Sequence, residues 1–201
     1  MYEVELKVRA SHDRLRTRLA ATDATLSERV RQVDTYYDAP HRSFAETDEA
    51  LRIRRTTALP ADPIDSGGAD PNNEADPDPT AVLTYKGPLL EAESKSREEF
   101  ESELGDPEAV DEALSRLGFS PAATVEKERT YYVLDGYTVT LDDVAGLGEF
   151  VEVEREQAEA GIEAVREGAR ELLEGLGLDP DEQIRTSYLG LLLAGPDEPS
   201  G

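Results

Sequence analysis

The sequence of 201 residues contains no cysteine. Disulfide bonds and thiolate chemistry are therefore excluded. It also lacks an apolar run of the about 18 residues that a membrane-spanning helix requires. The amino terminus has the alternating pattern of a strand instead of the apolar segment of a signal peptide. We therefore expect a cytoplasmic protein that has no membrane partner.

Lysine is scarce: it supplies only four of the 21 basic residues, whereas aspartate and glutamate together number 45. The formal net charge of −24 repels nucleic-acid backbones and anionic membrane surfaces, so neither is an expected partner. Few lysines among many acids are typical of halophilic proteins, whose acidic surfaces stay hydrated in salt. Each remaining base is informative, because a local cluster of bases can still bind an anion.

Hydrophobic periodicity predicts a single α+β domain over residues 1–195 and a flexible tail at 196–201. The expected strands, which are antiparallel, cover 2–8, 30–40, 49–56, 81–87, 95–104, 124–134, 137–144 and 148–156. The expected helices begin after Ser11 and after Asp106, and cover 159–175 and 181–193. Segment 58–80 is dense in Pro, Gly, Asp and Asn, so we expect a disordered acidic loop there.

The opening strand EVELKV alternates charged and apolar residues, which gives it one charged and one apolar face. The same alternation in other strands predicts two sets of charged residues on strand faces. The acids are Glu3, Glu5, Asp142, Glu152 and Glu154, and the bases are Lys7, Arg52, Arg54, Lys86, Lys127 and Arg129. Lys95, Arg97, Glu99 and Glu101 share one face of a further strand.

Two interpretations of these faces are open. A solvated sheet face with salt bridges is the simpler one. However, such a face in an acid-rich chain should be acidic throughout, and most of these strands carry bases instead. Clustered Lys and Arg suit a polyphosphate, and carboxylates beside them suit a hard divalent cation. Taken together, the faces favour a site.

Other chemistries have no clear signal. The sequence contains neither a G-x-x-x-x-G-K-[ST] loop nor an H-E-x-x-H pair, and GLGEF at 146–150 is too short for a dinucleotide fingerprint. His12 and His41 are isolated, and we expect both at the surface. The residues Tyr36, Tyr37, Tyr131 and Tyr132 are expected to pack within the sheet.

The motifs occur in an order that resembles the CYTH superfamily. They are E-x-E-x-K at the amino terminus, LRIRR at 51–55, TYKGP at 84–88, K-x-R at 127–129 and LDDVAGLGEFVEVE at 141–154. The helix containing SYLGLLL follows them. Within that superfamily, QVDTYYDAPHRSFAETDEALRIR is most similar to the class IV adenylyl cyclase branch, whose relatives include thiamine triphosphatases and inorganic triphosphatases.

The resemblance implies a closed antiparallel β-barrel, a triphosphate tunnel with helices packed outside and a polar lumen. The five acids named above would serve Mg²⁺ or Mn²⁺, and the six bases would hold phosphates. An amide in place of one of these acids is expected to relieve carboxylate repulsion and leave the fold intact. Lys95, Arg97, Glu99 and Glu101 would also face the lumen, with less defined roles.

Three functions remain open on the sequence. An adenylyl cyclase would convert ATP to cyclic AMP and pyrophosphate, and is the expected activity. A triphosphatase would hydrolyse the terminal phosphate of tripolyphosphate or thiamine triphosphate. A non-catalytic module that binds polyphosphate or a nucleotide is disfavoured, because it needs the bases but not five acids. No residue is identified as the catalytic base, and the oligomeric state is open, with a homodimer considered.

Overall fold

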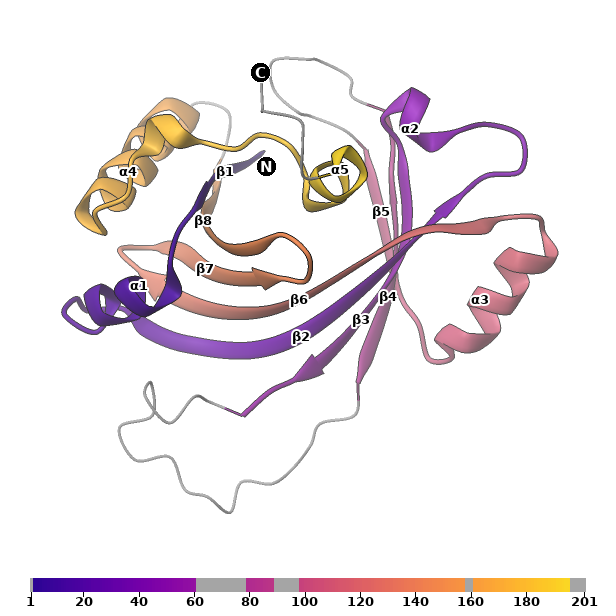
Figure 1. Cartoon of the computed structure of the whole chain (residues 1–201), viewed down its shortest axis with the longest axis horizontal. Coiled ribbons are helices and arrows are strands. Elements are labelled where there is room, and N and C mark those ends of the chain that lie inside the picture. Colours follow the sequence, from indigo (N-terminus) through magenta and orange to yellow (C-terminus); the bar gives the residue numbers. More distant parts are fainter. Residues whose placement is uncertain (1, 61–78, 89–97, 158–160, 196–201) are drawn as a thin grey trace. The chain divides into compact units, whose positions relative to one another are not determined.

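The computed structural model describes residues 2–60, 79–88, 98–157 and 161–195. Its strands form an eight-stranded sheet in the order β1-β8-β7-β6-β2-β3-β4-β5, and helices accompany them (Figure 1). The pairs β1–β8, β8–β7, β7–β6, β3–β4 and β4–β5 are antiparallel. The predicted α+β class is therefore confirmed. Closure of the sheet into a tunnel stays a prediction from the resemblance.

The chain divides into two compact units. Unit 1 comprises Met1–Val30, Ala58–Asp76 and Lys127–Gly201, and unit 2 comprises Arg31–Thr57 and Pro77–Glu126. Two long strands, β2 (Thr25–Asp38) and β6 (Ser120–Leu134), contribute residues to both units.

Unit 1 contains a sheet with one apolar and one charged face. Its strands include β1 (Tyr2–Arg9), β7 (Tyr137–Val144) and β8 (Gly148–Gln157), and its helices are α1 (His12–Leu19), α4 (Ile162–Gly175), the 3₁₀ turn η2 (Pro180–Glu182) and α5 (Tyr188–Ala194). Alternate residues of the three strands, among them Leu6, Val139 and Val153, pack with Leu15 of α1 and Leu173 of α4 in one buried core. Figure 1 shows α1 and α4 on the same side of β1 and β8.

A tight hairpin joins β6 and β7 in unit 1. Asp135 and Gly136 have φ values of 51° and 76°, which is the conformation that a two-residue hairpin with primed geometry requires. The register Leu134↔Tyr137 through Lys127↔Val144 follows from it. The hairpin agrees with the expected strands 124–134 and 137–144, and it fixes which β7 side chain lies opposite each β6 base.

Unit 2 contains β3 (Ala50–Ala58), β4 (Thr80–Lys86), β5 (Glu99–Glu103) and the helices α2 (Phe44–Thr47) and α3 (Pro107–Arg116). The Asp106 side chain caps α3 by accepting a hydrogen bond from the Ala109 N–H at 2.9 Å, as its sequence predicted.

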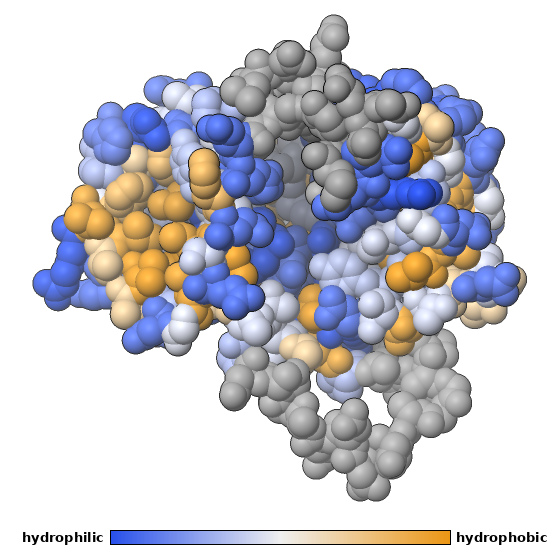
Figure 2. All heavy atoms as spheres, turned by 180° about the vertical axis from the view of Figure 1, so that it is seen from behind, coloured by the Kyte–Doolittle hydropathy of each residue, from blue (hydrophilic) through white to orange (hydrophobic). Residues whose placement is uncertain are grey.

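No residue of α3 is fully buried, and Leu117 at its end is 69% exposed. Figure 2 shows hydrophobic atoms gathered on the side where this helix lies.

Several expectations need correction. The helix expected over 181–193 is wrong in its first part, because η2 ends at Glu182 and α5 begins at Tyr188. Ile184 lies between them and donates its backbone N–H to the Lys7 carbonyl at 2.7 Å. This hydrogen bond to β1 takes the place of a hydrogen bond within a helix. Strand β2 begins at Thr25, and α2 was not anticipated.

The expected acidic loop lies mostly outside the described residues. Ala58 is still in β3 and Thr80 begins β4, while 61–78 are not described. The expected tail at 196–201 also lies outside the described residues. Among the described helices, none is long and apolar enough to cross a membrane.

Candidate functional site

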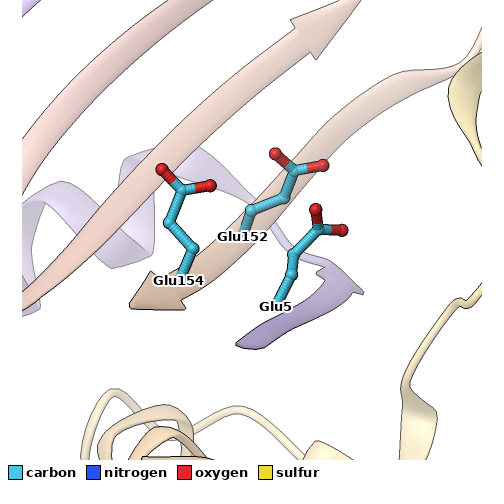
Figure 3. Close-up of side chains that lie close together, drawn as sticks. All are labelled: Glu5, Glu152 and Glu154. Atoms are coloured by element: carbon cyan, nitrogen blue, oxygen red, sulfur yellow. The ribbon is translucent and has the colours of Figure 1, made fainter. Parts of the chain in front are cut away.

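Three carboxylates meet on the charged face of unit 1. Glu5 comes from β1, and Glu152 and Glu154 come from the neighbouring strand β8, with Glu5 directly opposite Glu154 in the register. One carboxylate oxygen from each lies within 4.8 Å of the others, and Figure 3 shows the three side chains pointing the same way. Hard divalent cations such as Mg²⁺ and Mn²⁺ prefer oxygen donors of this kind. The donor set therefore fits the metal that the sequence predicts.

Lys7 lies beside this carboxylate cluster as a buried counter-charge. Its ammonium is 3.5 Å from Glu152 Oε1 and 3.7 Å from Glu5 Oε1, and its side chain is only 6% exposed. A buried ammonium is stable only where anions compensate for its lost hydration. The pairing shows that the E-x-E-x-K strand brings acid and base to one point of the sheet.

Arg129 joins two acids in a buried network. Its guanidinium donates to both oxygens of Asp142, at 2.6 and 2.5 Å, and to Glu152 Oε2 at 2.6 Å. Burial alone raises the pKa of Asp142, but the hydrogen bonds and charge of Arg129 outweigh it, so that pKa lies below its ordinary value. Burial lowers the pKa of Arg129, yet the adjoining acids raise it well above its ordinary value. Both groups are therefore charged.

Asp142 has a different position from the three clustered carboxylates. It is completely buried, and besides Arg129 it accepts a hydrogen bond from the Tyr188 hydroxyl at 2.8 Å. Its role as a metal ligand stays a prediction. Lys127, also buried, has its ammonium 5.4 Å from the centre of the Tyr188 ring. Sequence reasoning did not single out Tyr188, because it expected that residue inside a longer helix.

The bases of unit 2 form a second charged group around Asp34. This carboxylate is 1% exposed and accepts from Arg54 at 2.7 Å through both oxygens and from Arg52 at 3.3 Å. Nearby on β4 and β5, Thr84 donates to Glu101 at 2.8 Å and Lys86 to Glu99 at 2.7 Å. Arg52 opposes Thr84 in the register, so these residues share one sheet face. The sequence analysis did not identify Asp34 as a site residue, although it lies between Val33 and Thr35 in an expected strand.

Three predicted residues cannot be placed. The side chain of Glu3 is not described, although its backbone lies on β1 opposite Glu156. Lys95 and Arg97 lie outside the described residues altogether. Every other predicted acid and base lies on a strand, as expected. Some of these strands belong to unit 1 and the others to unit 2.

His12 corrects one expectation. It is 7% exposed rather than a surface residue, and its Nε2 lies 3.0 Å from the Phe150 carbonyl oxygen. It lines a small cavity of about 170 Å³ together with Glu128, Asp143 and Glu149. Glu128 and Asp143 alternate with Arg129 and Asp142, so this cavity is on the opposite face of the sheet from the carboxylate cluster.

Comparison with known proteins gives the family. The CYTH domain model matches residues 1–188. A candidate adenylate cyclase of Methanocaldococcus jannaschii is 33% identical over 193 residues, which cover 95% of this chain and 98% of that protein. The solved structure of a Pyrococcus horikoshii protein is 36% identical, with a TM-score of 0.75 and coverage of 96% of this chain and 99% of that one.

A more distant structure shows the same fold alone. It is a Hippeastrum protein described as a candidate adenylyl cyclase with dominant triphosphatase activity. It is 20% identical, covers 98% of both chains and has a TM-score of 0.65. The match of the domain model over most of the sequence, together with the M. jannaschii relative, shows that this chain belongs to the CYTH family.

Proposed function

We propose that this protein is a divalent-cation-dependent enzyme that acts on a triphosphate, with ATP as the substrate of an adenylyl cyclase reaction. The observation that carries the proposal is the charged face of unit 1, where Glu5, Glu152 and Glu154 gather beside Lys7 and Arg129. Burying charges is costly even where they pair with one another, which favours a site over a purely structural role, and family membership supports an enzyme.

The charge balance of this face supports an anionic substrate together with a metal. Glu5, Asp142, Glu152 and Glu154 carry four negative charges, whereas Lys7, Lys127 and Arg129 carry three positive ones. Without a metal the formal charges of these seven side chains sum to −1, which gives no net attraction for a triphosphate. Glu5, Glu152 and Glu154 would hold Mg²⁺ or Mn²⁺, which supplies charge neutralisation and Lewis acidity when bound. With the divalent cation the sum for these side chains becomes +1, and the ammoniums and guanidinium can bind phosphate oxygens.

Phosphoryl and nucleotidyl transfer depend mainly on such positioning and charge neutralisation. In the cyclase reaction, the ribose 3′-oxygen bonds to the α-phosphorus and its proton is released to solvent, while the bond from that phosphorus to the bridging oxygen breaks and its electron pair leaves with pyrophosphate. In the alternative reaction, a water oxygen bonds to the terminal phosphorus and the shortened phosphate leaves. The triphosphatase remains the second candidate because the related fold of the Hippeastrum protein is described with that activity.

Product analysis tests the proposal. The purified chain is incubated with ATP, tripolyphosphate or thiamine triphosphate, each with Mg²⁺ or Mn²⁺ in high salt. Cyclic AMP with pyrophosphate supports the cyclase, and orthophosphate with a diphosphate supports the triphosphatase instead. Binding of tripolyphosphate without any turnover would favour a binding module and contradict the proposed enzyme.

A further inference from the structure

The carboxyl-terminal segment of unit 1 places one aromatic side chain against the charged face. Ile184 donates its N–H to the Lys7 carbonyl at 2.7 Å, which fixes the segment beside β1. Ser187 then caps α5 by accepting from the Gly190 N–H at 3.1 Å, so that Tyr188 is the first residue of the helix. Its side chain is 7% exposed. Anchors before and at the start of the helix therefore hold this tyrosine in place.

The hydroxyl and the ring of Tyr188 contact two different parts of the network. The hydroxyl donates to Asp142 Oδ2 at 2.8 Å. The same oxygen accepts from Arg129 Nη2 at 2.5 Å, and that nitrogen also donates to Glu152 Oε2 at 2.6 Å. Glu152 pairs with Lys7, whose ammonium lies 4.3 Å from the centre of the Tyr188 ring. The contacts thus form a closed circuit that begins and ends at Tyr188.

Packing alone does not account for this arrangement. The ring makes an edge-to-face contact with Phe150, with ring centres 5.0 Å apart, and a phenylalanine could make the same contact. What a phenylalanine lacks is a donor for Asp142. Arg129 Nη2 is shared between Asp142 and Glu152, so an Asp142 without the tyrosine donor competes more strongly for that nitrogen. Glu152, which belongs to the carboxylate cluster, is then held less firmly.

We propose that Tyr188 is a positioning residue, which fixes Glu152 through Asp142 and Arg129 and holds the ammoniums of Lys7 and Lys127 against its ring. The inference rests on the proposed function, because the residues it positions are those assigned to the metal and the triphosphate. Cation–π contacts of this kind are strongest where water is excluded, as it is here. Tyr188 itself touches neither the metal nor the reacting atoms in this assignment.

Tyr188→Phe tests the hydroxyl, and Tyr137→Phe is its matched control. Tyr137 donates its buried hydroxyl to the Val165 carbonyl at 3.0 Å, on the core face of the same unit. Both variants lose one buried hydrogen bond, so a merely structural role predicts equal effects. Mn²⁺ binding to the metal-free protein is measured by calorimetry, and the dependence of turnover on Mn²⁺ and on ATP is measured separately.

We expect Tyr188→Phe to weaken Mn²⁺ binding roughly ten-fold, the scale of a lost hydrogen bond to a charged group, and to raise the Mn²⁺ concentration for half-maximal turnover in parallel. Its KM for ATP at saturating Mn²⁺ should stay within about two-fold of wild type, because the ring remains. Tyr188→Leu, which removes the ring too, should also weaken tripolyphosphate binding. Tyr137→Phe should match wild type in all three measurements.

Equal Mn²⁺ affinities of Tyr188→Phe and Tyr137→Phe would overturn the inference while leaving the proposed function intact. A wild type that binds neither Mn²⁺ nor tripolyphosphate would overturn the proposed function and the inference with it. Because Tyr188→Phe keeps the packing of the ring, it gives this answer even if Tyr188→Leu does not fold.

Discussion

The effect predicted for replacing Asp142 changes once its hydrogen-bond partners are known. From the sequence, its replacement by asparagine is expected to relieve repulsion among carboxylates and leave the fold intact. In the structure both its oxygens accept from Arg129, and the pair is buried. Removing one partner of a buried ion pair leaves the other charge uncompensated. Asp142→Asn is therefore expected to destabilise the protein instead of leaving its fold intact.

We predict that Asp142→Asn lowers the free energy of unfolding by about 3 to 5 kcal/mol at neutral pH, the range for breaking a buried pair. Asp143→Asn is the control, because Asp143 is the next residue and is exposed on the opposite face. Urea denaturation of the two variants and wild type gives the difference. Equal unfolding free energies for Asp142→Asn and Asp143→Asn would contradict the ion-pair interpretation.

The same pair predicts a pH dependence with a definite sign. The folded-state pKa of Asp142 is lowered, because Arg129 outweighs the effect of burial. Its stabilising contribution is therefore fully present above the unfolded pKa of about 3.9 and is lost as the pH falls through the lower folded pKa. The stability gap between wild type and Asp142→Asn should persist at neutral pH and shrink only in strong acid. A gap that closes near neutrality would mean that another group titrates.

Glu5 offers a cleaner test of the carboxylate cluster than Glu152 does. Its side chain is 36% exposed, whereas that of Glu152 is 5% exposed and pairs with both Lys7 and Arg129. Glu5→Gln should abolish most metal-dependent activity with little effect on unfolding, because it deletes one anionic oxygen donor and keeps the shape. Glu152→Gln should lose activity and also stability. Full wild-type activity in excess chelator would remove the metal from the proposal.

At the scale of elements, alternation along the chain was sufficient to predict most of the sheet and the face on which each charge lies. The pattern follows directly from the two-residue period of a strand, so Glu5 and Lys7 were predicted to share a face of their strand, and the resemblance implied that Arg129 and Glu152 join them. What the pattern could not show is which charges pair, since register depends on turns and on distant strands. The break between η2 and α5 was also missed, because it depends on the tertiary hydrogen bond between Ile184 and Lys7.

The connection between β3 and β4 can be tested by deletion. Thr56 pairs with Thr80 in the register, so removing 60–78 leaves Thr57, Ala58, Leu59 and Pro79 between them. Hairpin loops of about two to five residues are common, and shortening a loop changes its closure entropy only modestly. We predict that the deletion variant unfolds cooperatively, with a thermal midpoint close to that of wild type. A non-cooperative melt would show that the deleted segment contributes to the fold.

At the scale of the whole molecule, the sequence assigns phosphate-binding bases to both units. If Arg52, Arg54, Lys86, Lys127 and Arg129 bind a triphosphate, each alanine variant should weaken tripolyphosphate binding by about 1 to 3 kcal/mol, the scale of a charge-assisted hydrogen bond. Arg14 and Arg166 are the controls, because both lie exposed on helices of unit 1. Calorimetric titration of the seven variants decides between a site and a solvated charged face. Affinities indistinguishable from those of the controls would contradict the assignment.

The net charge of −24 predicts that salt stabilises the whole molecule. Repulsion between exposed acids acts over a screening length of about 10 Å at 0.1 M salt and about 3 Å at 1 M. The thermal midpoint should therefore rise between dilute buffer and molar KCl, and sucrose at equal osmolality, which does not screen charge, should not reproduce the dependence on ionic strength. An unchanged midpoint in KCl would show that acid repulsion does not limit stability.

The same thermal melts can separate the effect of salt on repulsion between surface acids from its effect on the buried Arg129–Asp142 pair. Pairs excluded from solvent are screened much less than surface charges, and Asp142 is completely buried. Salt should therefore raise the midpoints of wild type and Asp142→Asn together, while the difference between them stays nearly constant. If that difference shrank in parallel with the screening length, salt would be reaching the Arg129–Asp142 pair, and the pair would behave as a surface salt bridge.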